Sequence, residues 1–253
     1  MVEDRSVLDR PGPLPDLVLT YGDAPDQVIE LWLGADRAGI QTLVTVVHGG
    51  FWRPEYDRLH ARPMAAALRD AGWPVASVEY RRMPGRPDRT IDDVRAALCA
   101  LPDLHPAAAS GLVVVGHSAG GHLALLAGVD VPGLRGVLAL APVASLPIAH
   151  ELDLDDGAVA GFLGSDPADR ADLDPVQRAD VGCPVTIVHG IDDAIVPITL
   201  AEAYVDAHPA TRLVRLEHVG HFALIDPLSA AWPVVPAELA RLVDSSRRRF
   251  VGS

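Results

Sequence analysis

The sequence predicts an α/β protein in which helices cover both faces of a mostly parallel sheet. Short apolar runs alternate with helical stretches of about 10–15 residues, which is the pattern of successive strand–helix–strand units. Several of these runs are apolar on both faces, as expected of strands buried inside a parallel sheet. An antiparallel hairpin precedes them. We therefore expect one domain over residues 1–253, with its core at about 17–244.

The chain opens with the predicted hairpin. LVLTYG (17–22) and VIELWLG (28–34) are its strands, and the turn formers at 23–26 separate them. The β-branched run LVTVV (43–47) is the first predicted buried strand.

A helix is predicted from about residue 59 to 71, because Gly72 fits a helix C-terminal cap. PVASVEY (74–80) is the next strand. The helix after it should cover 91–101, with Thr90 as its N-cap.

A second strand–helix–strand unit follows, with a strand at 112–116, a helix at 119–129 and a strand at 136–142. Residues 145–180 are acidic and rich in Asp, Ala and Pro. We expect them to form a short cap-like insertion above the sheet. The remaining predicted elements are a strand at 184–190, a helix at 199–207, a strand at 212–217 and a helix at 230–244.

Composition excludes several classes of function. The formal net charge is −13, which argues against nucleic acid as a main partner. The longest uncharged stretch (136–149) is too short to span a membrane, and the acidic N-terminus does not resemble a signal peptide. With only Cys99 and Cys183, we expect buried, reduced thiols and a cytoplasmic location.

Four loops that follow predicted strands carry residues capable of chemistry. In an open parallel sheet the functional site lies beyond the carboxyl ends of the strands. The four loops are HGGFW (48–52), GHSAGG (116–121), HGIDDAIVP (189–197) and EHVGHFALIDP (217–227).

GHSAG matches the G-x-S-x-G nucleophile elbow, and it lies between a predicted strand and a predicted helix as that motif requires. Gly116 and Gly120 leave the backbones of strand and helix room to approach. Ser118 at the apex is the predicted nucleophile, with the helix N-terminus stabilising negative charge beside it.

A serine nucleophile needs a base, and the base needs an orienting acid. On a sheet of this type the order along the chain is serine, acid, histidine. The third loop offers Asp192 and Asp193 as the acid, and the fourth offers His218 and His221 as the base. Spacing alone leaves both choices open, although Gly220 permits a tight bend before His221.

Acyl transfer also needs hydrogen-bond donors for the oxyanion. The amide of Ala119, which follows the nucleophile, is one expected donor, and HGGFW should supply the other. We place the second donor at Gly50 and Phe51, with Gly49 as the alternative. Phe51 and Trp52 are also predicted to line the substrate pocket, although core packing is the alternative for Trp52.

The other histidines have structural interpretations. His122 is expected to pack within its helix, while His48 and His189 should brace their loops. No compact set of metal ligands and no phosphate-binding glycine loop is visible, so we expect neither a metal nor a cofactor.

Together, HGGFW, VEYRR, GHSAGGHLAL, HGIDDAIVP and GHFALIDP resemble small bacterial α/β-hydrolases similar to arylformamidases and to feruloyl and acetyl-xylan esterases. The resemblance runs from about residue 28 to 242. It implies the α/β-hydrolase fold, Asp193 as the acid and His221 as the base. It also implies oxyanion donors at Gly50 and Phe51.

The sequence thus predicts a serine hydrolase that cleaves a small carboxylic ester through an acyl-enzyme. The alternatives are an arylformamidase, a small serine peptidase and a non-catalytic ligand-binding protein of the same fold. The expected partner is a small ester or amide, with no nucleic acid and no membrane.

Overall fold

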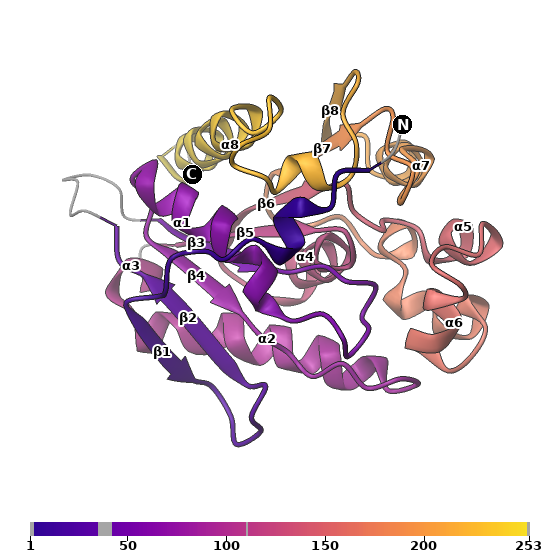
Figure 1. Cartoon of the computed structure of the whole chain (residues 1–253), viewed down its shortest axis with the longest axis horizontal. Helices are drawn as coiled ribbons and strands as arrows, with labels where there is room; N and C mark the ends of the chain where they lie inside the picture. The colour runs from indigo at the N-terminus through magenta and orange to yellow at the C-terminus, as the bar shows by residue number, and fades with distance from the viewer. Residues whose placement is uncertain (1–2, 35–41, 110, 252–253) are drawn as a thin grey trace.

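An eight-stranded sheet forms the centre of the computed structural model, which describes residues 3–34, 42–109 and 111–251 (Figure 1). Its strand order is β1-β2-β4-β3-β5-β6-β7-β8. β1 and β2 pair antiparallel, and β2 pairs antiparallel with β4, whereas all pairs from β4 to β8 are parallel. The strands are β1 (Leu17–Thr20), β2 (Val28–Trp32), β3 (Leu43–Val47), β4 (Val75–Val78), β5 (Leu112–His117), β6 (Leu134–Leu140), β7 (Val185–Gly190) and β8 (Arg212–Leu216).

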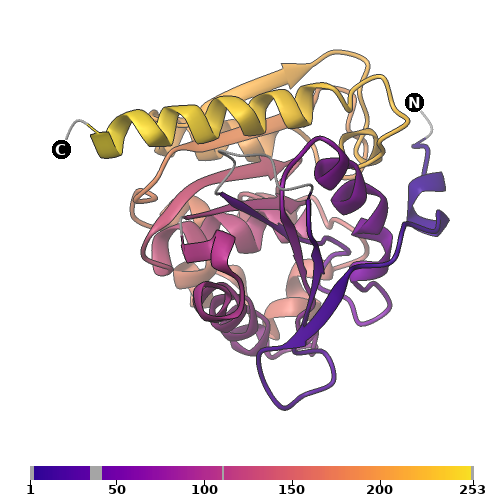
Figure 2. The same cartoon turned by 90° about the vertical axis from the view of Figure 1, so that its left-hand side faces the viewer.

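Helices cover both faces of the sheet, as predicted (Figures 1 and 2). One face carries α2 (Pro87–Leu104), α4 (Ala119–Asp130) and α7 (Thr199–Ala207). The opposite face carries α1 (Arg62–Asp70) and α8 (Val234–Val251).

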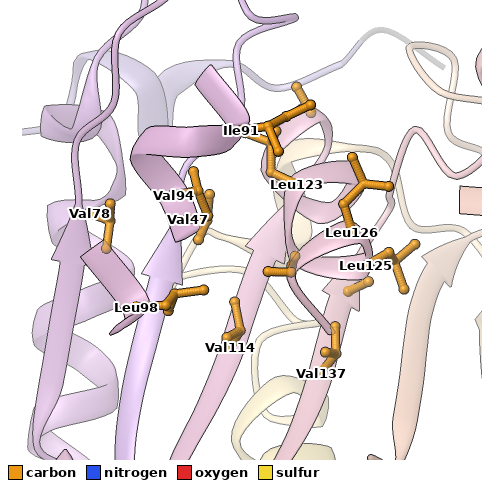
Figure 3. Close-up of a cluster of buried hydrophobic side chains, with 14 of the residues drawn as sticks. Val47, Val78, Ile91, Val94, Leu98, Val114, Leu123, Leu125, Leu126 and Val137 are labelled. Atoms are coloured by element: carbon orange, nitrogen blue, oxygen red, sulfur yellow. The ribbon is translucent and has the colours of Figure 1, made fainter. Parts of the chain in front are cut away.

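Each buried strand contributes side chains to the hydrophobic cores on both faces of the sheet, because successive side chains point to opposite faces. In β3, Leu43 and Val47 belong to the core under α2 and α4, while Val44 and Val46 pack toward α1 and α8. Figure 3 shows part of the first core, where Val47 and Val114 lie beneath side chains of α2 and α4.

The insertion between β6 and β7 holds short helices, as expected. They are α5 (Leu146–Glu151), α6 (Ala158–Leu163), η3 (Pro167–Leu173) and η4 (Pro175–Gln177). Four more short elements are η1 (Ser6–Asp9), η2 (Arg58–Ala61), α3 (Pro106–Ala109) and η5 (Phe222–Leu224).

The structure corrects three predictions. Thr90 is not an N-cap, because α2 begins at Pro87, whose ring suits the first helical turn; the Thr90 hydroxyl donates to the carbonyl of Arg81 instead. The last helix starts at Val234, not at residue 230. The buried-thiol prediction is wrong for Cys99, which is exposed on α2, and Cys183 is only half-buried.

Among the helices that the structure describes, none combines the length and apolar character needed to cross a membrane.

Leu98 on α2 is fully buried beneath the sheet, so Leu98→Ala should leave a cavity and lower the free energy of unfolding by about 2–5 kcal/mol. Chemical denaturation would measure the change. Leu228→Ala is the matched control, because that side chain is 78% exposed and its removal should cost less than about 0.5 kcal/mol. Equal losses in the two variants would contradict the assigned core.

Candidate active site

Ser118 lies at a strained turn between β5 and α4. Its backbone has φ 56° and ψ −121°, a conformation that costs a non-glycine residue about 1–3 kcal/mol. Three backbone hydrogen bonds hold it there. Its N–H donates to the Leu140 carbonyl at 2.9 Å, and its own carbonyl accepts from the N–H groups of Val143 and His122 at 3.2 and 3.1 Å.

The glycines around Ser118 allow this turn. A Cβ on Gly116 would lie 2.2 Å from the carbonyl oxygen of Gly120, and one on Gly120 would lie 2.1 Å from that of Val47. Both distances are far below van der Waals contact. The elbow therefore depends on backbone packing that a side chain at either position would prevent.

The loops after β7 and β8 bring Asp193 and His221 together. The Nδ1 atom of His221 lies 2.7 Å from Oδ2 of Asp193, and both side chains are buried. The other carboxylate oxygen accepts from the N–H groups of Ile195 and Val196 at 2.9 and 2.8 Å. Nε2 of His189 lies 3.5 Å from Oδ2.

Burial by itself would raise the pKa of Asp193. Hydrogen bonds from His189 and His221, together with the backbone N–H of Val196, more than offset that effect and hold the pKa well below its usual range. Asp193 is therefore an anion that faces Nδ1 of His221 at neutral pH.

The alternative pair lies on the surface. Nδ1 of His218 is 3.4 Å from Oδ2 of Asp192, and the His218 side chain is 85% exposed. Neither residue lines the pocket that holds Ser118. The same two loops thus carry one buried Asp–His pair and one exposed pair, and only the buried pair has a member, His221, in the pocket of Ser118.

The HGGFW loop packs directly on the elbow. A Cβ on Gly49 would lie 3.0 Å from Cβ of Ser118. The next three residues, Gly50, Phe51 and Trp52, all have positive φ (111°, 49° and 56°). The N–H of Arg53 donates to the Gly50 carbonyl at 2.9 Å and closes this turn. Two consecutive non-glycine residues with positive φ are unusual and mark a loop held in a strained shape.

A buried network of hydrogen bonds holds the start of the HGGFW loop against the end of β4. Nδ1 of His48 lies 2.8 Å from the Gly49 carbonyl, and its Nε2 lies 3.0 Å from a carboxylate oxygen of Glu79. The Tyr80 hydroxyl donates to the His48 carbonyl at 2.7 Å. Burial alone would raise the pKa of Glu79, but His48 and the neighbouring arginines hold it well below its usual range.

Ser118 and His221 line a common pocket. Its described lining consists of Arg5, Leu8, Gly50, Phe51, Tyr56, His60, His117, Ser118, Asp155, Ile195, His221 and Phe222. Of the predicted oxyanion residues, Gly50 and Phe51 line the pocket. Ala119 is buried at the first position of α4, directly after the serine.

Trp52 does not line this pocket, in contrast to the prediction. Its ring is buried, stacks on Phe162 of α6 at a centroid distance of 4.4 Å, and meets His122 edge-on at 5.1 Å. Trp52 therefore attaches the insertion to the core, because its ring packs between Phe162 of the insertion and His122 of α4. His122 packs as expected, and His48 and His189 brace their loops.

The fold is shared with known hydrolases. Residues 29–133 match the family model BD-FAE. Esterase B from Lactobacillus rhamnosis superimposes with a TM-score of 0.77 at 21% identity, over 97% of this chain and 90% of that one. The protein has the α/β-hydrolase fold.

Curated proteins similar to this chain include esterase LipC of Mycobacterium tuberculosis, which is 27% identical over 239 residues. That match covers 81% of the chain but 57% of LipC. Kynurenine formamidase of Danio rerio is 30% identical over 107 residues, covering 42% of the chain and 36% of that enzyme. The chain thus spans about half the length, or less, of these relatives.

The N-terminal segment of the chain also reaches the site, beside the loop that follows β8 (Figure 1). The Glu3 carboxylate accepts from the N–H of His221 at 2.9 and 3.0 Å and from the N–H of Ala194 at 3.3 Å. A Cβ on Gly220 would lie 2.5 Å from the same carboxylate. Glu3 therefore links the loop of Asp193 to the loop of His221, and Gly220 leaves it room.

Sequence reasoning missed several residues of the pocket wall. Tyr56 and His60 follow the HGGFW loop closely, so their place in the chain was a usable signal. No local signal in the sequence identifies Glu3, Arg5 or Leu8. Their contacts with the site join residues about two hundred positions apart and leave no periodic pattern. Within the described residues, no group of three or more His, Cys, Asp or Glu is placed to hold a metal ion.

Glu3→Ala should loosen both loops, because two or three hydrogen bonds to a carboxylate disappear. We expect the free energy of unfolding to fall by about 1–3 kcal/mol, and amide hydrogen exchange to become faster in residues 189–197 and 217–227. Asp9→Ala, a change at an exposed acid of the same segment, is the control and should alter neither quantity. Unchanged exchange in the Glu3 variant would show that the link does not hold the loops.

Three further histidines near the site, the buried His117 and His122 and the half-buried His60, are uncharged at neutral pH. Burial is the main cause in each case: it lowers the pKa of His60 to about 3 and that of His122 to about 4, and the pKa of His117 falls well below its usual value. In the unfolded chain each titrates near 6.5. Between pH 6.5 and about 4 the unfolded state therefore binds more protons than the folded state.

Stability should consequently fall as the pH drops from about 6.5 to 5, by up to roughly 1 kcal/mol per pH unit for each histidine. Urea unfolding at pH 7, 6 and 5 would measure this slope. His122→Gln should make the free energy of unfolding less dependent on pH, by the contribution of one histidine. The same slope in that variant would mean that His122 is not neutral in the fold.

Proposed function

We propose that the protein hydrolyses a small carboxylic ester through an acyl-enzyme. The observation that carries this proposal is the shared pocket of Ser118 and His221, with Asp193 buried behind the histidine. The matches to LipC and to the BD-FAE model support the same reaction class.

In the proposed mechanism, Nε2 of His221 takes the proton of the Ser118 hydroxyl while the oxygen attacks the ester carbonyl. The tetrahedral intermediate collapses, and His221 gives the proton to the departing alkoxide. Water then attacks the acyl-enzyme, His221 takes a proton from that water, and the acid leaves as Ser118 is reprotonated. Asp193 keeps the Nδ1–H tautomer of His221 and stabilises the imidazolium.

The amide N–H groups of Ala119, Gly50 and Phe51 are the proposed donors to the oxyanion. Ala119 opens α4, where free amides and the helix dipole favour negative charge, and the strained HGGFW loop packs on the elbow beside it. Each such donor is worth about 3 kcal/mol in the transition state. In this proposal, the strained backbone of Phe51 and Trp52 is what turns the amide N–H groups of the loop toward the oxyanion.

Arylformamidase activity is the second candidate, favoured by the match to kynurenine formamidase. The same residues would cleave a formamide, with the amine as leaving group. A panel of p-nitrophenyl esters of increasing acyl length, run beside N-formylkynurenine, decides between the two.

Ser118→Ala should reduce ester turnover by at least about 10⁴-fold and abolish labelling by a fluorophosphonate probe. Asp193→Asn should reduce turnover by about 10⁴-fold without loss of folding, because the tautomer of His221 is then wrong. Ser165→Ala, a change outside the pocket, is the control and should leave both readouts unchanged. Labelling that survives in the Ser118 variant would rule out this serine as the nucleophile.

A further inference from the structure

The segment from Glu3 to Arg10 lies along one wall of the pocket and is fixed at several points. Glu3 binds the loops of Asp193 and His221, as described above. Val7 is buried in the core beside α1 and α8, and Leu8 lines the pocket. Arg10 forms an ion pair with Asp226, four residues beyond Phe222. The segment is therefore part of the folded structure around the site.

Arg5 is held over the mouth of this pocket. Its backbone carbonyl accepts from the N–H of Leu8 at 2.9 Å, and its guanidinium carbon lies 5.5 Å from the centre of the Phe222 ring. That distance is within the range of a cation–π contact. The side chain lines the same pocket as Ser118 and His221 and is exposed to solvent there.

Arg5 forms no ion pair with any carboxylate in the described part of the chain, unlike Arg10 in the same segment. The protein has 34 acidic and 21 basic residues, so carboxylates that could pair with an arginine are in excess. The Arg5 guanidinium therefore keeps its donors free for a group that enters the pocket.

The other charged and titratable groups around the pocket are compensated or neutral. The Asp155 carboxylate accepts from Nε of Arg53 at 2.6 Å. His60 and His117 are uncharged, because burial keeps the pKa of each well below neutral. Among the described lining residues, the positive charge of Arg5 is the one that lacks a counter-charge.

We propose that Arg5 forms a subsite for a carboxylate group, so that the preferred substrate is an ester whose acyl or alcohol part carries a second, anionic carboxylate. The proposal rests on the proposed function, because the subsite is defined relative to Ser118. A guanidinium offers a planar pair of donors that matches the two oxygens of a carboxylate. Phe222 beneath it holds the cation in place and provides an apolar surface for the substrate chain.

Matched pairs of neutral and anionic esters test this. For the alcohol side, 4-acetoxybenzoate is compared with 4-acetoxybenzamide. For the acyl side, monoethyl glutarate is compared with ethyl 4-carbamoylbutanoate. The wild-type enzyme should show a kcat/KM about 3- to 10-fold higher for the anionic member of at least one pair, mainly through KM, because an exposed ion pair is worth a modest factor.

Three variants separate the charge of Arg5 from other effects. Arg5→Gln should remove the preference, because kcat/KM falls more for the anionic ester of a pair than for its neutral partner. Arg5→Lys should keep part of the preference, since the charge remains while the paired donors are lost. Arg89→Gln removes an exposed arginine of α2 that lies outside the pocket, so it should change nothing.

Equal kcat/KM within both pairs, or a preference that survives in Arg5→Gln, would overturn the proposal. If no ester is hydrolysed at all, the proposed function has failed, and binding decides the subsite separately. Calorimetry with 4-hydroxybenzoate, 4-hydroxybenzamide and glutarate gives that answer. Carboxylate binding that is lost in Arg5→Gln would support the subsite, and the absence of such binding in the wild type would overturn it.

Discussion

The close approach of β5, the elbow and α4 is the constraint on which the rest of the site depends. The backbones meet at Gly116 and Gly120 at distances that leave no space for a Cβ. Ser118 is therefore forced to positive φ, and its backbone is held by hydrogen bonds to β6 and to the turn after it. Because Gly49 packs on the same serine, the HGGFW loop takes its position from the elbow as well. A relaxed turn here would displace Ser118 and the HGGFW loop together.

The Asp193–His221 pair depends on a second close approach, between the ends of β7 and β8. Gly190 pairs with Leu216, and a Cβ on Gly190 would lie 2.0 Å from the Val219 carbonyl oxygen. This contact brings the loop of Asp193 against the loop of His221. The carboxylate then receives enough hydrogen bonds to remain charged despite burial. Burial without those donors would favour a neutral acid, which cannot orient an imidazole in the same way.

Part of the pocket wall comes from segments of the chain outside the loops that follow the strands. Asp155 enters from the insertion, and Trp52 with Phe162 attaches that insertion to the core. On the other side, the N-terminal segment supplies Arg5 and Leu8, while Glu3 ties it to the histidine loop. The residues that would contact a substrate are thus less dependent on the sheet than those that would perform the chemistry.

The sequence by itself was sufficient for the mostly parallel sheet, for the order of its helices and for the four loops that follow strands, although not for the start of α2 or α8. Periodicity, glycine spacing and the G-x-S-x-G pattern are local features, and each reports directly on backbone geometry near Ser118. The spacing of these loops did not decide between Asp192 and Asp193 as the acid, or between His218 and His221 as the base. The candidates lie close together on the same loop, so their spacing from the serine is nearly the same. The resemblance to known hydrolases favoured Asp193 and His221. Only the tertiary structure separates a buried pair from an exposed one, places Trp52 in the core, and brings Glu3 and Arg5 to the site. Those outcomes follow from burial and from contacts between residues far apart in the chain, which no local pattern encodes.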